Sequence, residues 1–433
     1  MLKTTKVLAI VLCACMIFGM LAGCTSAPAP TPAPPTAATP APGAPAPAPA
    51  DTTETFRLGV IYPLSGDLAK FGQEEIKGVQ IAADLLNAAG GINGKMIELV
   101  QADAPTADAA TAEAERLITV EKVNAIMGSY SSGVAYAGSA VSEKYQTIWW
   151  ENSGVADNIT QRGFEYLFRF GITGTNLGES QALMVNELVA PSLGVDPSEL
   201  KIALIYEDSA YGTSVADGME KTANELGLNI VLREGYSNTT TDLSSLILKM
   251  RQAGANVVTP TFYVNDGLLL FRQMKELGYQ PDAVVCGANS VQDLKNALGD
   301  GINGLFHADI TQPRTNEAAA NGLEAYIAEY KNRYDNQEPW SAHSIRTYAG
   351  ATVFFDALKN AASFSSDDIA AACRAIDIPL YGTAEGWGCL FDESGQNVRA
   401  LSFGCVWFDG NPVTVWPAEA AYEGVEFTLP WRY

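Results

Sequence analysis

Short loops that follow runs of β-forming residues carry the side chains best suited to hold a small molecule. The loop from Gly128 to Gly133 (Gly-Ser-Tyr-Ser-Ser-Gly) separates an apolar run from a helical pattern. Its hydroxyls and free backbone N–H groups suit a carboxylate or a phosphate, because a helix N-terminus favours anions. Ser131 or Ser132 could equally cap that helix, since serine favours the cap position. Both interpretations are open from spacing alone, and Tyr130, Ser131 and Ser132 are candidate site residues.

A second loop of this kind runs from Trp149 to Val155 (Trp-Trp-Glu-Asn-Ser-Gly-Val). Paired aromatics followed by an acidic residue, a hydroxyl and a glycine at a strand end indicate part of a pocket. We expect one of the two tryptophans to pack in the core. The candidate site residues of this loop are Trp150, Glu151, Ser153, Gly154 and Val155.

Two later loops occupy equivalent positions between a strand pattern and a helix pattern. They are Tyr206 to Gly212 (Tyr-Glu-Asp-Ser-Ala-Tyr-Gly) and Thr261-Phe262-Tyr263. Aromatic side chains that face a cleft from both sides would hold a small ligand between them. Tyr211 and Tyr263 are therefore candidate ligand contacts.

Enzymatic and metal-binding patterns are missing from the sequence. The chain has two histidines, His307 and His343, and neither stands in a metal or triad arrangement. Gly90 to Met96 resembles a phosphate loop, but it lacks the required spacing and follows a helix rather than a strand. Ser131 has no basic partner nearby and no G-x-S-x-G elbow is present. We expect no catalytic residue, no cofactor and no metal.

Four cysteines lie beyond the N-terminal segment, and their spacing matches no zinc pattern. Buried small hydrophobic residues and a disulfide are both open interpretations. The four are Cys286, Cys373, Cys389 and Cys405.

Two series of alternating strand and helix patterns would position these loops. The first runs from Arg57 to Trp150 and the second from Lys201 to Val285. This order predicts parallel sheets covered by helices on both faces, with ligands held at the carboxyl ends of the strands. The tail alternates around Asp392-Glu393-Ser394-Gly395, which predicts a hairpin. About 380 residues of globular composition suit two domains.

The first 54 residues predict export and anchoring. Lys3 and Lys6 precede an apolar run whose length is typical of a signal peptide and too short for a permanent membrane span. The run ends in Leu21-Ala22-Gly23-Cys24, which resembles a bacterial lipobox. We expect residues 1–23 to be a lipoprotein signal peptide and Cys24 to carry the lipid. Residues 24–54, rich in proline and alanine, predict an extended tether on the outer side of the bacterial cell membrane.

The formal net charge of the 433 residues is −22. So acidic a chain would repel a phosphate backbone, and we expect no nucleic-acid partner.

Several short motifs, in order and spacing, resemble one known family, the leucine/isoleucine/valine-binding type of periplasmic binding protein. They lie between Phe56 and Asp409 and include Gly59-Val60-Ile61-Tyr62-Pro63-Leu64-Ser65-Gly66, Asn87-Ala88-Ala89-Gly90-Gly91-Ile92-Asn93-Gly94, Asp103, Gly128-Ser129-Tyr130-Ser131-Ser132, Thr160-Gln161-Arg162-Gly163, Tyr211-Gly212 and Phe391-Asp392-Glu393-Ser394-Gly395.

The resemblance implies an α/β fold with two Rossmann-like lobes, mainly parallel sheets and three crossing hinge segments. It implies a lobe formed by residues 55–172 plus 311–383, and a second formed by 173–310 plus 384–433. The lobes of this family close on a ligand as a Venus flytrap does.

The resemblance also implies roles in the site. Ser131, with backbone near Ser153 and Val155, would hold a carboxylate. Tyr211 and a residue near Tyr263 would hold an ammonium group, together with an acidic side chain after the strand at Val284-Val285. Phe71 would line the apolar part of the pocket.

Two departures from the family pattern concern the ligand. Val155 stands where a threonine is frequent, and Gly287-Ala288-Asn289-Ser290 offers no acidic side chain at the ammonium position. An ammonium group in a closed cleft without a carboxylate is poorly compensated. Either Glu151 or Glu207 replaces the missing carboxylate, or the ligand is not an α-amino acid. Asn289 completes the candidate site.

We expect an extracytoplasmic solute-binding component of an ABC importer, with permease subunits as partners and a small amino acid, amide or carboxylate as ligand. One alternative is a ligand-sensing receptor that works with a membrane signalling partner. Another is a secreted α/β hydrolase.

Overall fold

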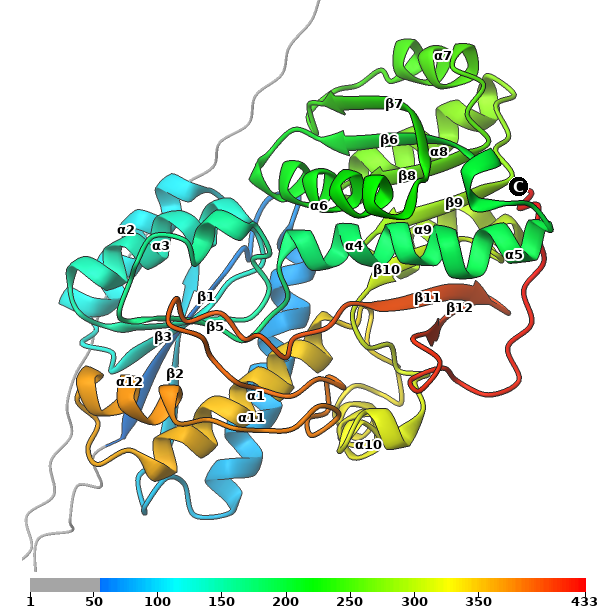
Figure 1. Ribbon diagram of the computed structural model, residues 1–433. Helices are drawn as coiled ribbons and strands as arrows, with labels where there is room; N and C mark the ends of the chain where they lie inside the picture. The colour runs from blue at the N-terminus through cyan, green and yellow to red at the C-terminus, as the bar shows by residue number, and fades with distance from the viewer. Residues whose placement is uncertain (1–54) are drawn as a thin grey trace, which may run out of the picture. The chain divides into compact units, whose positions relative to one another are not determined.

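Two β-sheets, each with helices on both faces, form the described part of the chain, residues 55–433 of a computed structural model (Figure 1). The predicted α/β fold with two mainly parallel sheets is confirmed. Residues 1–54, with the predicted signal peptide, Cys24 and tether, lie outside the described residues.

The first sheet contains five parallel strands in the order β2-β1-β3-β4-β5. Alternate residues of β1 belong to different cores: Leu58 packs with helices α1 and α11, and Ile61 with α2 and α3. Both faces are therefore apolar, as in sheets that helices cover on each side. The elements are β1 (Phe56–Tyr62), α1 (Ala69–Ala88), β2 (Ile97–Asp103), α2 (Ala107–Thr119), β3 (Ala125–Gly128), α3 (Ser132–Lys144), β4 (Ile148–Glu151), β5 (Leu167–Arg169), α10 (Leu323–Arg333), α11 (His343–Asn360) and α12 (Ser366–Arg374).

Helices α1 and α11 approach each other closely at Gly78. A Cβ atom at this position would lie 2.1 Å from the backbone oxygen of Ser344. Only glycine fits at this position, because a larger residue would clash with α11. The close contact holds the first turns of α11 beside the ends of the strands.

The second sheet contains seven strands in the order β12-β11-β10-β9-β8-β6-β7. Ile202 and Leu204 face α4 and α6, whereas Ala203 and Ile205 face α7, α8 and α9. Only β11 and β12 run antiparallel to their neighbours. The elements are α4 (Gly174–Met184), α5 (Ala190–Leu193), β6 (Lys201–Glu207), α6 (Ala210–Leu226), β7 (Asn229–Tyr236), α7 (Ser244–Gln252), β8 (Val257–Thr261), α8 (Val264–Glu276), β9 (Ala283–Gly287), α9 (Gln292–Leu298), β10 (Phe306–Asp309), β11 (Phe403–Phe408) and β12 (Asn411–Trp416).

The tail forms a hairpin one element later than predicted. The turn at 392–395 exists, since Gly395 N donates to Asp392 O over 3.1 Å, but the residues on either side of it form an isolated bridge, from Phe391 to Asn397, and no strand. The hairpin instead pairs β11 with β12 around Asp409-Gly410. Residues 387–391 contribute buried side chains to the core of the first lobe, and Cys389 forms an isolated antiparallel bridge with Ile378.

The chain passes from one sheet to the other three times: between β5 and α4, between β10 and α10, and before β11. Gln396 bridges Arg169 of β5, and Phe391 packs on Phe168. These contacts favour a third crossing near residue 400, later than the boundary at 383/384 that we expected.

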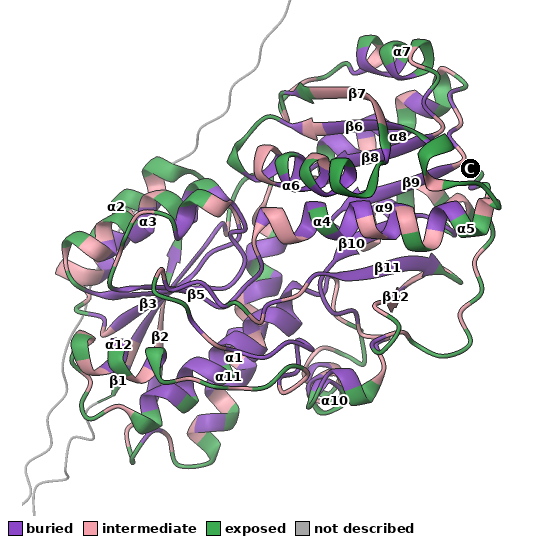
Figure 2. Ribbon diagram, viewed as in Figure 1, coloured by how far each residue is buried: buried purple, intermediate pink, exposed green. Residues whose placement is uncertain are grey.

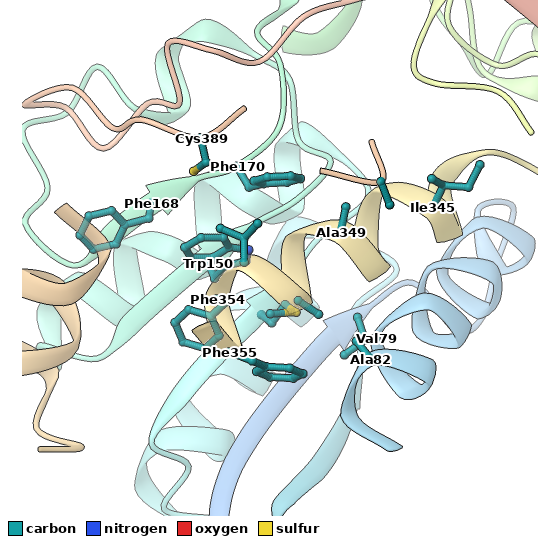
Figure 3. Packing of buried hydrophobic residues seen from close by; sticks show 14 of the residues in the cluster. Val79, Ala82, Trp150, Phe168, Phe170, Ile345, Ala349, Phe354, Phe355 and Cys389 are labelled. Carbon is teal, nitrogen blue, oxygen red and sulfur yellow. The ribbon is translucent and has the colours of Figure 1, made fainter. Parts of the chain in front are cut away.

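Both tryptophans of the 149–155 loop are fully buried, on opposite faces of the first sheet. Trp150 packs against Phe170 and Phe354 (Figure 3). It also packs against Phe391. Figure 2 shows that buried residues follow the strands and the inner faces of the helices. The four cysteines of the described chain are free and buried.

Candidate functional site

A small internal cavity of about 30 Å³ lies where the carboxyl ends of the strands of both sheets meet. Side chains of both lobes line it. They are Tyr130, Ser132, Ser153, Val155, Leu177, Tyr211, Tyr263, Ala288, Asn289, His343 and Arg346.

A larger outer pocket of about 690 Å³ shares Tyr263 with this cavity. It lies between residues of the first lobe, such as Asp67 and Ser131, and residues of the second, such as Thr239 and Asp266. Another hollow of about 740 Å³ is lined by Arg57 and Asn124, at the amino ends of the strands. Open α/β sheets bind ligands at the carboxyl ends, so the inner cavity and the outer pocket together form the candidate cleft.

The sequence left open whether the serines at 131 and 132 cap a helix or bind a ligand, and the structure is compatible with both roles. Ser131 Oγ accepts a hydrogen bond from Val134 N over 3.3 Å and caps α3. Ser132 Oγ accepts from Ala156 N over 3.1 Å. A hydroxyl that accepts can still donate its own hydrogen. Ser132 lines the inner cavity and Ser131 the outer pocket, so both could also donate to a ligand.

Glu151 joins two loops and is not free to meet a ligand. One carboxylate oxygen accepts from the backbone N–H groups of Ser129, Ser153 and Gly154, over 2.7 to 2.9 Å. Burial raises the pKa of Glu151, and these hydrogen bonds act in the opposite direction. The side chain fixes the strand-end loops, and it does not line the cavity.

Glu207 has the same kind of role in the second lobe. Its oxygens accept from Ser209 N over 3.0 Å and from Gly212 N over 2.7 Å, at the start of α6. Neither Glu151 nor Glu207, the two replacement carboxylates that we considered, lines the inner cavity.

The second lobe offers a turn after β9 that carries Ala288 and Asn289. Both residues have left-handed backbone angles, with φ of 61° and 62°. His307 Nδ1 lies 2.8 Å from Ala288 O, and burial lowers the pKa of this histidine. The turn presents Asn289 Oδ1 to the first lobe, where Tyr130 donates to it over 3.1 Å.

Aromatic rings surround the cavity. Tyr263 lies 5.3 Å from Tyr211 and 6.3 Å from Tyr130, measured between ring centroids. Phe71 stacks on Tyr130 at 4.3 Å but does not line the cavity, so it supports the pocket wall from behind. Tyr211 donates to Gly287 O over 2.9 Å, which leaves its oxygen able to accept.

The structure brings most of the predicted site residues together and excludes a few. Trp150 lies in the core, Phe71 lies behind Tyr130, and Gly154 holds Glu151 through its N–H without reaching the cavity. Those that line the inner cavity are Tyr130, Ser132, Ser153, Val155, Tyr211, Tyr263 and Asn289.

Sequence reasoning missed Arg346 and His343, which α11 brings to the cavity. His343 lies edge-on to Phe71 and Tyr130 at 5.2 and 5.3 Å, and burial lowers its pKa well below the usual value. Arg346 was detectable, because it is the one Lys, Arg, Asp or Glu between Pro339 and Phe355.

A metal-binding cluster and a membrane-spanning helix are both absent from residues 55–433. No cluster of His, Cys, Asp or Glu there could hold a metal ion. No helix in that range is both long and apolar enough to cross a membrane.

Comparison with known proteins identifies relatives over nearly all of the described chain. The periplasmic binding protein family matches residues 55–410. A Leu/Ile/Val-binding protein homolog 8 of Brucella abortus is 44% identical over 374 residues, covering 86% of this chain and 93% of the relative. A homolog 7 of Brucella suis is 42% identical over 377 residues, covering 86% and 94%. These relatives are named as binding proteins, in agreement with the expectation of a non-enzyme.

Solved structures share the fold at lower identity. The leucine-binding protein LivK of Thermotoga maritima superposes with a TM-score of 0.72 at 22% identity, covering 83% of this chain and 97% of that one. The branched-chain amino acid substrate-binding protein LivJ of Streptococcus pneumoniae, in complex with isoleucine, gives 0.71 at 23%, covering 87% and 100%. The family implies an extracytoplasmic location. The chain belongs to the periplasmic binding protein family and is a substrate-binding protein of the Leu/Ile/Val-binding type.

Proposed function

We propose that this chain is the solute-binding component of an ABC importer and captures a small amino acid, amide or carboxylate between its lobes. The main support is the cavity, which residues of both lobes line and beside which Tyr130 donates a hydrogen bond to Asn289. A ligand that touches both walls favours the closed arrangement, and closure creates a surface for the permease.

The proposed ligand contacts differ in what they offer. Ser132 can donate a hydrogen bond, Tyr211 can accept one, and Val155 and Leu177 supply apolar surface. The cavity is small and residues of both lobes line it, so we expect the lobes to move apart when the ligand enters. The relatives named for leucine, isoleucine and valine support a branched apolar body for the ligand.

Lipid anchoring through Cys24 is part of the same proposal and rests on the sequence alone. Metabolic labelling with radioactive palmitate in a bacterial host should label the full-length chain. The Cys24→Ala variant should remain unlabelled, and equal labelling of both proteins would contradict the anchor.

Thermal unfolding in the presence of candidate ligands tests the binding role. Full-length protein, solubilised in mild detergent, should unfold at a higher temperature with at least one of a panel of branched and aromatic amino acids, their amides and the corresponding carboxylates. A ligand at 100 times its Kd stabilises the native state by about 2.7 kcal/mol. Failure of the whole panel to raise the Tm would contradict the proposed function.

A further inference from the structure

Arg346 is a buried cation with few partners. Its side chain comes from the first turn of α11, is 2% exposed and lines the inner cavity. Nη1 lies 3.4 Å from Ser153 O, a long contact, and Nε has no hydrogen-bond partner among the described residues. A guanidinium has five N–H donors, and buried charges are normally paired.

No carboxylate of the described residues pairs directly with this guanidinium, although its charge interacts with Glu75 and Glu385. Within residues 55–433 no ion pair joins Arg346 to an acidic side chain at 4.0 Å or less, and no acidic residue lines the inner cavity. Glu75 and Glu385 lie nearby and are fully buried. Burial raises the pKa of both well above the usual range, and the positive charge of Arg346 acts in the opposite direction on both.

Glu75 is partly occupied by another contact. Its Oε1 accepts a hydrogen bond from Ser153 Oγ, and its Oε2 has no partner among the described residues. The hydroxyl of Ser153 therefore donates its hydrogen to Glu75, and the backbone oxygen of Ser153 faces Arg346. Among the serines that line the cavity, Ser132 keeps a hydrogen to donate.

We propose that Arg346 is the anion-binding residue of the cleft and that the ligand carries a carboxylate, which pairs with this guanidinium. Arginine matches a carboxylate with two parallel N–H···O bonds, and the hydroxyl of Ser132 belongs to a residue that lines the same cavity. A carboxamide is neutral and offers one acceptor oxygen, so the same site discriminates against it. This inference rests on the proposed binding function and excludes simple amides from its ligand range.

Matched pairs of probes test the inference in calorimetric titrations of the full-length protein. The pairs are L-leucine with L-leucinamide, 4-methylpentanoate with 4-methylpentanamide, and benzoate with benzamide. Wild type should bind at least one carboxylate, and its carboxamide about 100-fold more weakly. Arg346→Gln should weaken the carboxylate to the level of the carboxamide. Arg346→Lys should give an intermediate Kd, because charge remains but the paired geometry is lost.

The unfolding temperature without ligand separates a binding role from a structural one. Loss of an unpaired buried charge should leave the Tm of Arg346→Gln unchanged or raised, whereas a structural role predicts a lower Tm. Arg272→Gln, at a side chain that is 65% exposed in α8, is the control and should change neither the Kd of the carboxylate nor the Tm.

The outcomes separate the inference from the proposed function. If carboxamides bind as tightly as carboxylates, or Arg346→Gln binds the carboxylate as wild type does, the inference fails and the binding function stands. If no probe binds wild type, the proposed function fails and the inference fails with it. Should Arg346→Gln not fold, Arg346→Lys and the wild-type pairs decide between the same outcomes.

Discussion

The hydroxyl of Tyr130 donates a hydrogen bond to Asn289 Oδ1 over 3.1 Å, and this bond joins the two lobes across the candidate cleft. Tyr130 belongs to the loop after β3 and Asn289 to the turn after β9. Asn289 is held in turn by its amide, which donates to Phe262 O. The pair stabilises the closed arrangement through a direct contact between the lobes.

Removing this bond should shift the lobes toward the open arrangement and weaken binding. Tyr130→Phe and Asn289→Ala each delete the bond, which contributes about 1 kcal/mol, so we expect Kd to rise about fivefold. Calorimetric titration with the best probe of the panel measures the change. Tyr422→Phe, at a side chain 46% exposed, is the matched control. Unchanged affinity in both variants would show that the bond does not contribute to closure.

Ser131 should affect stability through its capping bond to Val134 N. Ser131→Ala should lower the free energy of unfolding by about 1 kcal/mol, and Ser131→Asn should restore most of it, because asparagine also caps helices. Urea unfolding followed by circular dichroism gives both values. If Ser131→Ala is as stable as wild type, the capping assignment is wrong.

Trp150 should matter for stability rather than for ligand contact. Its ring packs among Phe170, Phe354 and Phe391, and truncation to alanine should cost about 3–5 kcal/mol. Trp150→Phe keeps an aromatic ring and should bind the probe with wild-type affinity at a lower Tm. Weaker binding at an unchanged Tm would instead place Trp150 in contact with the ligand.

Asp266 should make stability depend on pH. Burial raises its pKa from 3.8 to about 7, and the neighbouring Glu207 adds to this shift. The folded state therefore holds the proton more tightly than the unfolded chain does. Its contribution to stability is full below about pH 4, falls as the pH rises toward 7, and is absent above that.

Asp266→Asn removes this titration and keeps a partner for Tyr236, whose hydroxyl donates to Asp266 Oδ2 over 2.9 Å. We expect wild type to lose stability relative to Asp266→Asn between pH 4.5 and 8 in urea titrations. Parallel pH profiles for the two proteins would contradict the raised pKa.

The loops of the site were predictable because parallel strands place their carboxyl ends at one edge of a sheet. Ser132, Ser153, Tyr211 and Tyr263 were found in this way. The position of Trp150 could also have been derived. Neighbouring residues of a strand face opposite sides, and a sheet covered on both sides buries both tryptophans.

The residues that α11 brings to the cavity could not be predicted from the positions of the strand ends. Arg346 and His343 reach the cavity from a helix, and their approach depends on the close contact of α11 with Gly78 of α1. Such a long-range contact leaves no local pattern, apart from a single charge within an apolar helical stretch. The hairpin was displaced for a related reason, since residues 387–391 pack on the first lobe and Cys389 bridges to Ile378 rather than to a residue of β11.

Ligand-induced closure is the central claim, and a distance across the outer pocket tests it most directly. Asp67 and Thr239 are exposed, belong to different lobes and line that pocket, while the four cysteines of the described chain are buried. Spin labels on Asp67→Cys and Thr239→Cys report their separation by pulsed electron paramagnetic resonance. We predict that a carboxylate probe shown by titration to bind shortens and narrows the distance distribution. An identical distribution with and without that bound probe would contradict capture by closure.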